Sequence, residues 1–365
     1  MKLSTTLSAY IGRQFVIWFA VVFAGIAFVV LLADAIELLR RAAGKDQATF
    51  AIVAEMALLK LPQMMLLLMP FAVLFGGMLA YWRLARTREL VVTRAAGVSV
   101  WQFLLPALFI ALMIGATRVA VLGPFAAAML SRYENLEALH LSSGTGSQLS
   151  VSDSGVWLRQ LDPDGESLIH ADHVEPTSRQ LLDVVIFRFA GDGRFLGRID
   201  ADSADLEGGT WLIRGASLSD RRAEPKQVAS VTLPTDLTWA QIESSLALPE
   251  TMSVWELASF IPMMERTGFA TARHRLHLQS QLASPLLLCA MVLIAASSTL
   301  RANPRGRAAH MIMIGVGIGF AFYIASDIVA ALGLSGRLPA ELAAWAPASV
   351  CTMLGTAMLF HLEDG

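Results

Sequence analysis

The chain has 365 residues, of which 55% are hydrophobic and 16% are charged, and its mean hydropathy is +0.56. Soluble globular domains carry about 25% charged residues, so this composition excludes an ordinary soluble protein and indicates a polytopic membrane protein. The net charge of −2 hides an uneven distribution, because residues 131–268 hold 21 of the 30 acidic residues and only 11 of the 28 basic ones.

Six stretches are apolar for long enough to cross a membrane, which takes about 20 residues in a helix. They are residues 14–36, 61–82, 101–123, 279–299, 309–332 and 342–361. The first stretch is longer than a signal-peptide core and has no convincing cleavage site, so we expect a retained span. The layout is therefore three spans, an acidic polar insertion and three further spans.

Positive charges in short loops predict the orientation of the spans, because such loops stay in the cytoplasm. The loops that share a side with the amino terminus carry Lys2, Arg13, Arg83, Arg86, Arg88, Arg94, Arg301, Arg305 and Arg307. The opposite loops carry fewer basic residues, namely Arg40, Arg41, Lys45, Lys60 and Arg337, partly offset by Glu37, Asp46, Glu55 and Glu341. We expect both termini in the cytoplasm and, for a bacterial inner membrane, residues 131–268 in the periplasm.

Within the insertion, short β segments alternate with turn residues. They are residues 155–160, 167–174, 181–190, 195–206, 210–218 and 227–233. At least six short strands with tight turns predict an antiparallel sandwich or jelly roll, and residues 253–266 predict an amphipathic helix after it. The predicted fold class is an α-helical polytopic membrane protein, three plus three spans, with an inserted all-β, jellyroll-like domain.

Charged residues gather at the end of the first span, namely Asp34, Glu37, Arg40 and Arg41. If the helix continues, Glu37 precedes the two arginines by three and four residues, which is a favourable ion-pair spacing. One interpretation is an interfacial anchor whose arginines extend to water. The other is a site for anionic headgroups or phosphates, which guanidinium groups bind in bidentate fashion.

A basic segment between the second and third spans forms a second candidate site. Its arginines alternate with leucine and valine, so a short amphipathic helix along the membrane is expected, ended by Gly97. One interpretation is a loop that only sets orientation. The other is a helix that binds a cytoplasmic partner through Glu89, the one acid among Arg83, Arg86, Arg88 and Arg94.

The chain is not expected to catalyse a reaction itself. The sequence has no phosphate-binding GxxxxGK[ST] loop, no paired-histidine metal motif and no nucleophile elbow. Cys289 and Cys351 lie in apolar runs and are expected to be buried small hydrophobes. Asp327 lies within the fifth span, where an ionisable residue is costly and suggests function, but a proton relay would need partners in other spans.

Five short motifs follow one another along nearly the whole chain. They are YIGRQF at residues 10–15, ELLRR at 37–41, RELVV at 88–92 with AAG at 95–97, GVW at 155–157, and GFAFY at 319–323 with Asp327. In this order, on a three-plus-three layout, they resemble the LptF/LptG family, the permeases of the lipopolysaccharide-export ABC transporter, and within it the LptG branch.

This resemblance implies a non-catalytic subunit that pairs with an LptF-type paralogue. Two copies of the ATPase LptB would drive the transporter. Because those subunits bind the ATP, no cofactor is expected in this chain. It implies extraction of lipopolysaccharide from the inner membrane and transfer to LptC and periplasmic LptA. Glu37, Arg40, Arg41 and Arg132 would bind substrate, although Asp34 stands where relatives have lysine. The coupling residues would be Arg83, Arg86, Arg88, Glu89, Arg94 and Gly97.

The implied domains are residues 1–130 with a coupling helix at about 83–98, the periplasmic β domain at 131–268, and residues 269–365. From the residues alone, ion-driven transport remains open although the spans lack buried charges, and two other classes remain open as well. One is a membrane sensor or scaffold with a ligand-binding β domain, although only residues 361–365 follow the last span. The other is a mechanotransmitting permease of the MacB or FtsX type, which would have four spans.

Overall fold

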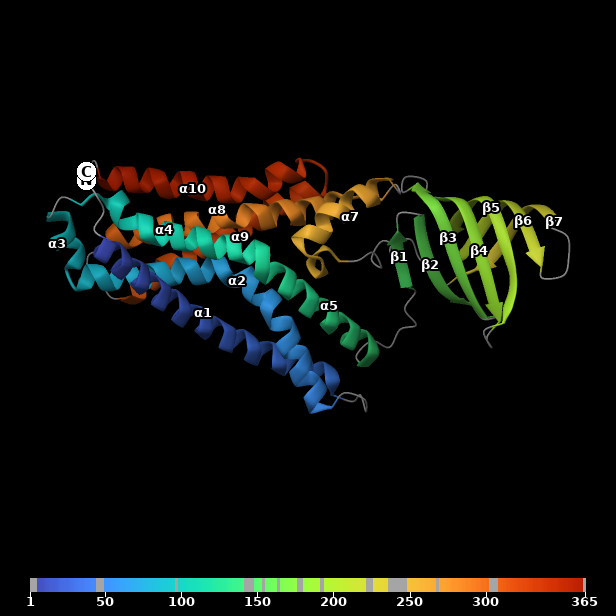
Figure 1. Ribbon diagram of the computed structural model, residues 1–365, viewed down its shortest axis with the longest axis horizontal. Helices are drawn as coiled ribbons and strands as arrows, with labels where there is room; N and C mark the ends of the chain where they lie inside the picture. Colours follow the sequence, from blue (N-terminus) through green and yellow to red (C-terminus); the bar gives the residue numbers. More distant parts are fainter. Residues whose placement is uncertain are drawn as a thin grey trace. The chain divides into compact units, whose positions relative to one another are not determined.

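The computed structural model describes residues 5–43, 49–95, 98–140, 148–152, 155–162, 165–175, 180–190, 194–220, 226–235, 248–266, 269–301 and 308–363. The chain separates into a helical unit, residues 1–142 with 275–365, and a β unit, residues 143–274 (Figure 1). These boundaries fall later than the predicted ones at 130/131 and 268/269. The first boundary is later because the third span continues as helix as far as His140, and the second is later because the first residues of α8 group with the β unit.

The helical unit contains the six predicted spans, because six of its described helices are long and apolar enough to cross a membrane. Its helices are α1 (Thr5–Ala42), α2 (Phe50–Arg86), α3 (Glu89–Ala95), α4 (Val100–Thr117), the π-helix η1 (Arg118–Leu122), α5 (Gly123–His140), α8 (Ala272–Arg301), α9 (Ala308–Leu334) and α10 (Ala340–Glu363). The third span is α4, η1 and α5 in continuous succession. The first three spans extend well beyond their apolar centres, so charged residues at those ends lie on helix rather than in loops.

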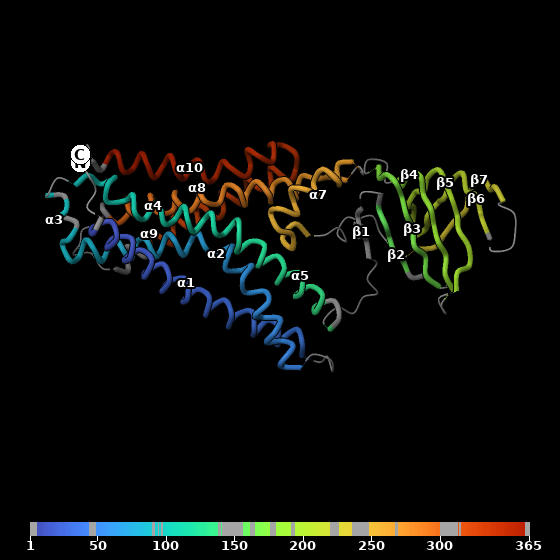
Figure 2. Tube along the Cα trace, in the orientation of Figure 1, coloured from blue at the N-terminus to red at the C-terminus, as the bar shows by residue number. Residues whose placement is uncertain are grey.

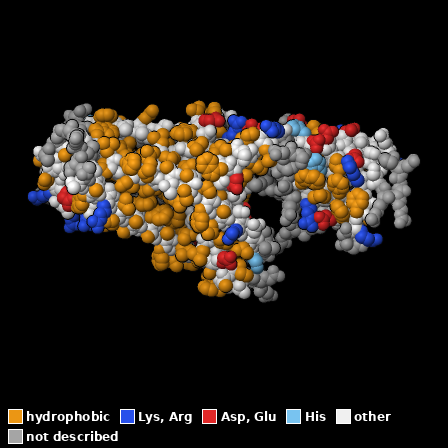
Figure 3. Space-filling view, in the orientation of Figure 1, with side chains coloured by type: hydrophobic (Ala, Val, Ile, Leu, Met, Phe, Trp, Pro, Cys, Tyr) orange, Lys and Arg blue, Asp and Glu red, His pale blue; other side chains and the backbone are white. Residues whose placement is uncertain are grey.

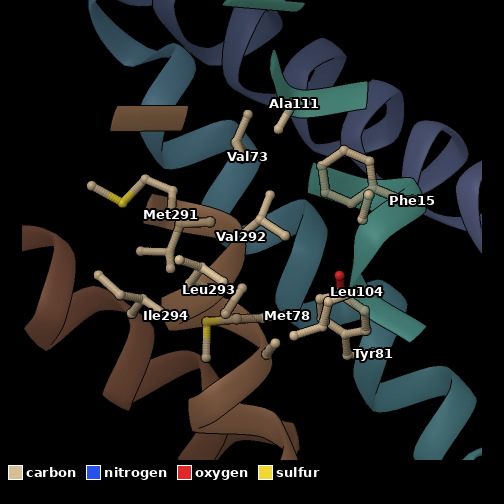
Figure 4. Close-up of a cluster of buried hydrophobic side chains, with 14 of the residues drawn as sticks. Phe15, Val73, Met78, Tyr81, Leu104, Ala111, Met291, Val292, Leu293 and Ile294 are labelled. Carbon is tan, nitrogen blue, oxygen red and sulfur yellow. The ribbon is translucent and has the colours of Figure 1, made fainter. Parts of the chain in front are cut away.

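One apolar cluster holds these helices together. Phe15 of α1, Met78 and Tyr81 of α2, Leu104 of α4 and Val292 of α8 are all at most 2% exposed and converge in it (Figure 4). Glycines allow the backbones to approach, as small residues do between membrane helices. A Cβ added at Gly115 would lie 2.5 Å from the Cα of Pro285, so α4 and α8 pack at backbone distance there.

The outer surface of the helical unit is apolar. On α1, Phe28 is 63% exposed and Ile36 is 66% exposed, and hydrophobic side chains cover most of the visible face of this unit in Figure 3. Figure 2 shows α1 and α2 running side by side along much of their length. Such a surface is stable only against hydrocarbon or a partner, which agrees with six membrane spans.

The β unit is one antiparallel sheet of seven strands in the order β1 to β7. The strands are β1 (Gln148–Ser152), β2 (Gly155–Asp162), β3 (Gly165–Glu175), β4 (Gln180–Ala190), β5 (Phe195–Glu207), β6 (Thr210–Asp220) and β7 (Lys226–Pro234). The six predicted strands are present and β1 is additional. Every strand pairs with its neighbour in sequence, so the described strands form a meander, whereas a jelly roll pairs two Greek keys.

One face of this sheet carries the core of the β unit. Buried residues alternate along β3, β4 and β5, as expected for a sheet that is buried on one side. In that core, the Oε1 of Gln160 accepts from Trp211 Nε1 at 3.1 Å and from Thr235 Oγ1 at 2.9 Å. These bonds satisfy the polar atoms of an otherwise apolar interior.

The predicted amphipathic helix is present as α7 (Val254–Arg266), preceded by the 3₁₀ turn η2 (Pro249–Thr251). A capping box starts α7: Ser253 N donates to Glu256 Oε2 at 2.7 Å, and Glu256 N donates to Ser253 Oγ at 3.2 Å. Met264 of α7 and the following Phe269 belong to the core of the sheet. The helix is therefore part of the β unit.

Candidate sites at the two ends of the second span

The end of α1 carries a fixed arrangement of charges. Glu37 accepts two hydrogen bonds from Arg40, from Nε and Nη2 at 2.8 Å each, and one from Arg41 Nε at 2.9 Å. The helix continues through these residues, so the predicted spacing of three and four residues brings the charges together. Arg41 also reaches Glu137 of α5 at 3.5 Å.

The two guanidinium groups remain accessible in this arrangement. The side chain of Arg40 is 75% exposed and that of Arg41 is 50% exposed. They also lie in the last turn of α1, where the negative end of the helix dipole favours cations. Glu37 therefore orients two exposed guanidinium groups, which keep donors free for an anionic ligand.

A second ion pair at this end was not predicted. Lys60 Nζ lies 2.6 Å from Asp34 Oδ1, with side chains only 18% and 14% exposed, and 5.5 Å from the ring centre of Tyr133. The sequence reading placed Lys60 in an outer loop, but α2 already begins at Phe50 and carries it as a helical residue. The pair thus joins Asp34 of α1 to Lys60 of α2, which also lies over Tyr133 of α5, and Asp34 is mostly buried.

Arg132, a predicted substrate residue, is not joined to this cluster. It lies on α5 beside Tyr133 and is exposed, and in the described part of the chain no hydrogen bond or ion pair connects it to Glu37, Arg40 or Arg41. Tyr133 and Glu137 are four residues apart on the face of α5 toward α1, and a helical residue one position away points about 100° aside. The structure therefore brings together Glu37, Arg40, Arg41 and Glu137, and leaves Arg132 apart.

At the other end of α2, the prediction of a helix over about 83–98 is wrong about where that helix begins. Arg83 and Arg86 belong to the last turn of α2, where Arg86 lies 5.2 Å from the ring centre of Trp82. The helix then ends, because Thr87 Oγ1 donates to the carbonyl of Arg83 at 3.0 Å and Arg88 adopts a left-handed φ of 60°. The short helix α3 begins only after this break.

Glu89 is the first residue of α3, which spans Glu89–Ala95. An acid in the first turn is stabilised by the positive end of the helix dipole. Its side chain is half-buried and makes no ion pair with Arg88 or with any other described residue. Val92, one turn on, is 68% exposed. The side chain of Arg94 and the whole of Gly97 lie outside the described residues.

Sequence reasoning also passed over Arg118, in the apolar run of the third span. It begins the π-helix η1 and lines the same cavity as Asp327 of α9. The signal that could have found it is simple, because it is the one charged residue between Trp101 and Ser131. The two cysteines are free thiols; Cys351 is buried, as the sequence predicts, whereas Cys289 is only half-buried.

Comparison with known proteins agrees with this architecture over almost the full chain. The family described as "Lipopolysaccharide export system permease LptF/LptG" matches residues 9–361. "Lipopolysaccharide export system permease protein LptG" of Escherichia coli (strain K12) is 25% identical over 358 residues, covering 94% of each chain. The protein of the same name from Haemophilus influenzae is 24% identical over 356 residues, again covering 94% of each. The chain therefore belongs to the LptF/LptG family of lipopolysaccharide export permeases.

Proposed function

We propose that this chain is a non-catalytic transmembrane half of an ABC transporter that extracts lipopolysaccharide from the inner membrane and passes it to a periplasmic bridge. The observation that carries the proposal is the family match over residues 9–361 on a frame of six spans with one inserted β unit. We further propose that it pairs with an LptF-type permease and an LptB ATPase dimer, and that LptC and LptA receive the lipid.

In this proposal both termini face the cytoplasm and residues 131–268 face the periplasm. The orientation rests on the basic residues at the end of α2, where Arg83, Arg86 and Arg88 are exposed. Arg40 and Arg41 then lie at the periplasmic side, at the level of the outer leaflet. There they meet the phosphates of lipid A, because exposed guanidinium groups oriented by a carboxylate can bind phosphate through their remaining donors.

The short helix α3 is the proposed contact for the ATPase. Its exposed Val92 offers an apolar surface, and the carboxylate of Glu89 is available to a donor on the partner because no described residue occupies it. A rigid connection from α3 to the spans is needed for ATP hydrolysis to move them. The turn at Arg88, with its left-handed backbone, fixes the angle at which α3 leaves α2.

The β unit is the proposed first section of the bridge. The sheet has two edge strands, β1 and β7, whose outer backbone groups have no partner among the described strands. An edge strand can extend a sheet into a second protein by strand addition. The β domains of LptC or LptA are the proposed partners for such pairing.

The coupling assignment is tested by Glu89→Ala in proteoliposomes that contain the full chain, its paralogous permease and the ATPase. Lipopolysaccharide release is expected to fall by at least about tenfold, because a charged hydrogen bond is worth roughly 1.5–3 kcal/mol. Glu341→Ala, at an exposed acid at the start of α10, is the matched control and should release lipid normally. Normal release by Glu89→Ala would show that α3 does not couple through this residue.

The substrate assignment is tested by photo-crosslinking to lipopolysaccharide from a probe at Ile36, which is 66% exposed on α1. The double variant Arg40→Glu with Arg41→Glu should lose most of the crosslink, because two attractive charges become repulsive. Arg337→Glu, an exposed arginine between α9 and α10, controls for the change in charge. An unchanged crosslink would show that the two arginines do not bind lipopolysaccharide and act only as an interfacial anchor.

A further inference from the structure

A partly open cavity of about 290 Å³ lies in the helical unit between α2, η1, α8, α9 and α10, with Arg118 half-buried and Asp327 exposed. Most of its lining is apolar, but it also contains Arg118, Ser280, Ser284, Ser326 and Asp327. Arg118, Ser326 and Asp327 make no hydrogen bond or ion pair with any described residue, and the Ser326 hydroxyl is fully buried. The cavity thus combines one cation, one anion and one unsatisfied hydroxyl within membrane-spanning helices.

These groups lie at similar depths. The third and fifth spans cross the membrane in the same direction, since successive spans alternate. Arg118 is 18 residues after Val100, where α4 begins, and Asp327 is 19 residues after Ala308, where α9 begins. At about 1.5 Å per residue, each lies roughly 27–29 Å along its helix, near the far boundary of a hydrocarbon core about 30 Å thick. That is the level of lipid headgroups.

Charged side chains in a span are costly unless a partner, water or a headgroup compensates them. A direct ion pair between Arg118 and Asp327 would be one solution, but the two groups are not within ion-pair distance although they line one cavity. Arg118 also begins the π-helix η1, and π-helical turns occur frequently at functional sites. The arrangement therefore suits a ligand that carries both charges and fits between the two groups.

We propose that this cavity binds the headgroup of one zwitterionic phospholipid, with its phosphate on Arg118 and the Ser326 hydroxyl and its ammonium group on Asp327. The primary ammonium of phosphoethanolamine provides three donors for the carboxylate, whereas a choline headgroup provides none. The volume is at the lower limit of small-molecule sites, roughly 300–1,000 Å³, so it accommodates a headgroup and not a whole lipid.

The surface around the cavity accommodates the rest of such a lipid. Tyr323 lines the cavity and is 52% exposed, as expected of an aromatic residue at the membrane interface. Along the same helix, Phe320 is 65% exposed, Val316 is 53% exposed and Met313 is 71% exposed. Acyl chains can lie along this apolar surface toward the membrane centre. The site is separate from Arg40 and Arg41, and the inference does not depend on the proposed export function.

The test measures which lipids the full-length chain retains. The chain is purified in detergent, washed free of loose lipid, incubated with phosphatidylethanolamine, phosphatidylcholine or phosphatidylglycerol, and examined by native mass spectrometry. One phosphatidylethanolamine should bind per chain, with phosphatidylcholine and phosphatidylglycerol at least about tenfold weaker, because choline has no N–H donor for the Asp327 carboxylate and glycerol has no cation. Equal retention of the three lipids would overturn the proposal.

Variants connect the binding to the cavity. Arg118→Gln and Asp327→Asn should each lower phosphatidylethanolamine occupancy by about tenfold or more, and Arg337→Gln, an exposed control, should leave it unchanged. Because the charge variants can also disturb folding, Ser326→Ala provides a milder change that should weaken binding by about 2- to 10-fold. Unchanged occupancy in Ser326→Ala together with either charge variant refutes the site. Displacement of the phospholipid by equimolar lipopolysaccharide would assign the cavity to the export substrate instead.

Discussion

The ion pair between Lys60 and Asp34 gives a quantitative prediction for the helical unit. Lys60→Met keeps the length of the side chain but removes its charge, so the Asp34 carboxylate is left without its cation, and its Oδ2 already lacks a partner in the described structure. Exposed pairs are worth about 0–1 kcal/mol, and breaking a buried pair costs about 3–5 kcal/mol. With side chains 18% and 14% exposed, we expect a loss of about 2–3 kcal/mol.

The assay is unfolding of the purified full chain in mixed micelles, followed by tryptophan fluorescence, with Asp34→Leu and the double variant completing a double-mutant cycle. The double variant should recover most of the loss, because no charge is then left unpaired. Arg337→Met, which removes an exposed cation, should change stability by less than about 0.5 kcal/mol. If Lys60→Met were as stable as that control, the pair would not clamp α1 to α2.

Three further predictions concern packing and turns. Gln160→Leu removes the acceptor of the buried Trp211 indole and of the Thr235 hydroxyl and should lower the stability of the β unit by about 2–4 kcal/mol, measured by hydrogen exchange of its strands in the full chain. Gly115→Ala places a Cβ 2.5 Å from the Cα of Pro285 and should lower the free energy of unfolding by about 1–3 kcal/mol, measured by thermal unfolding. The control is Gly25→Ala, whose added Cβ has nothing within 4 Å; it should leave the stability unchanged or raise it by up to about 1 kcal/mol. Arg88→Gly should preserve the turn before α3 and Arg88→Val should disrupt it, because glycine adopts a φ of 60° without strain and a β-branched residue does not. The readout is protease cleavage at that turn.

Local pattern was sufficient for much of this protein. Apolar runs of membrane length predicted six spans, and alternation with turn residues predicted six of the seven strands, because these signals depend only on neighbouring residues. The spacing of Glu37, Arg40 and Arg41 likewise predicted their ion pairs. The ends of the helices could not be predicted, because the residues there are polar and fall outside the apolar pattern that identifies a span. For that reason Lys60 and residues 131–140 were assigned to loop and insertion.

The tertiary structure decided every contact that joins distant segments. Asp34 meets Lys60 across 26 residues of sequence, Arg41 meets Glu137 across 96, and Arg118 shares a cavity with Asp327 only because η1 and α9 pack around it. A single charge in an apolar run has no periodic partner that would reveal its role. The sequence by itself determined the spans, the strands and the local charge pairs, and packing alone decided which of the remaining charges are neutralised and which have no partner among the described residues.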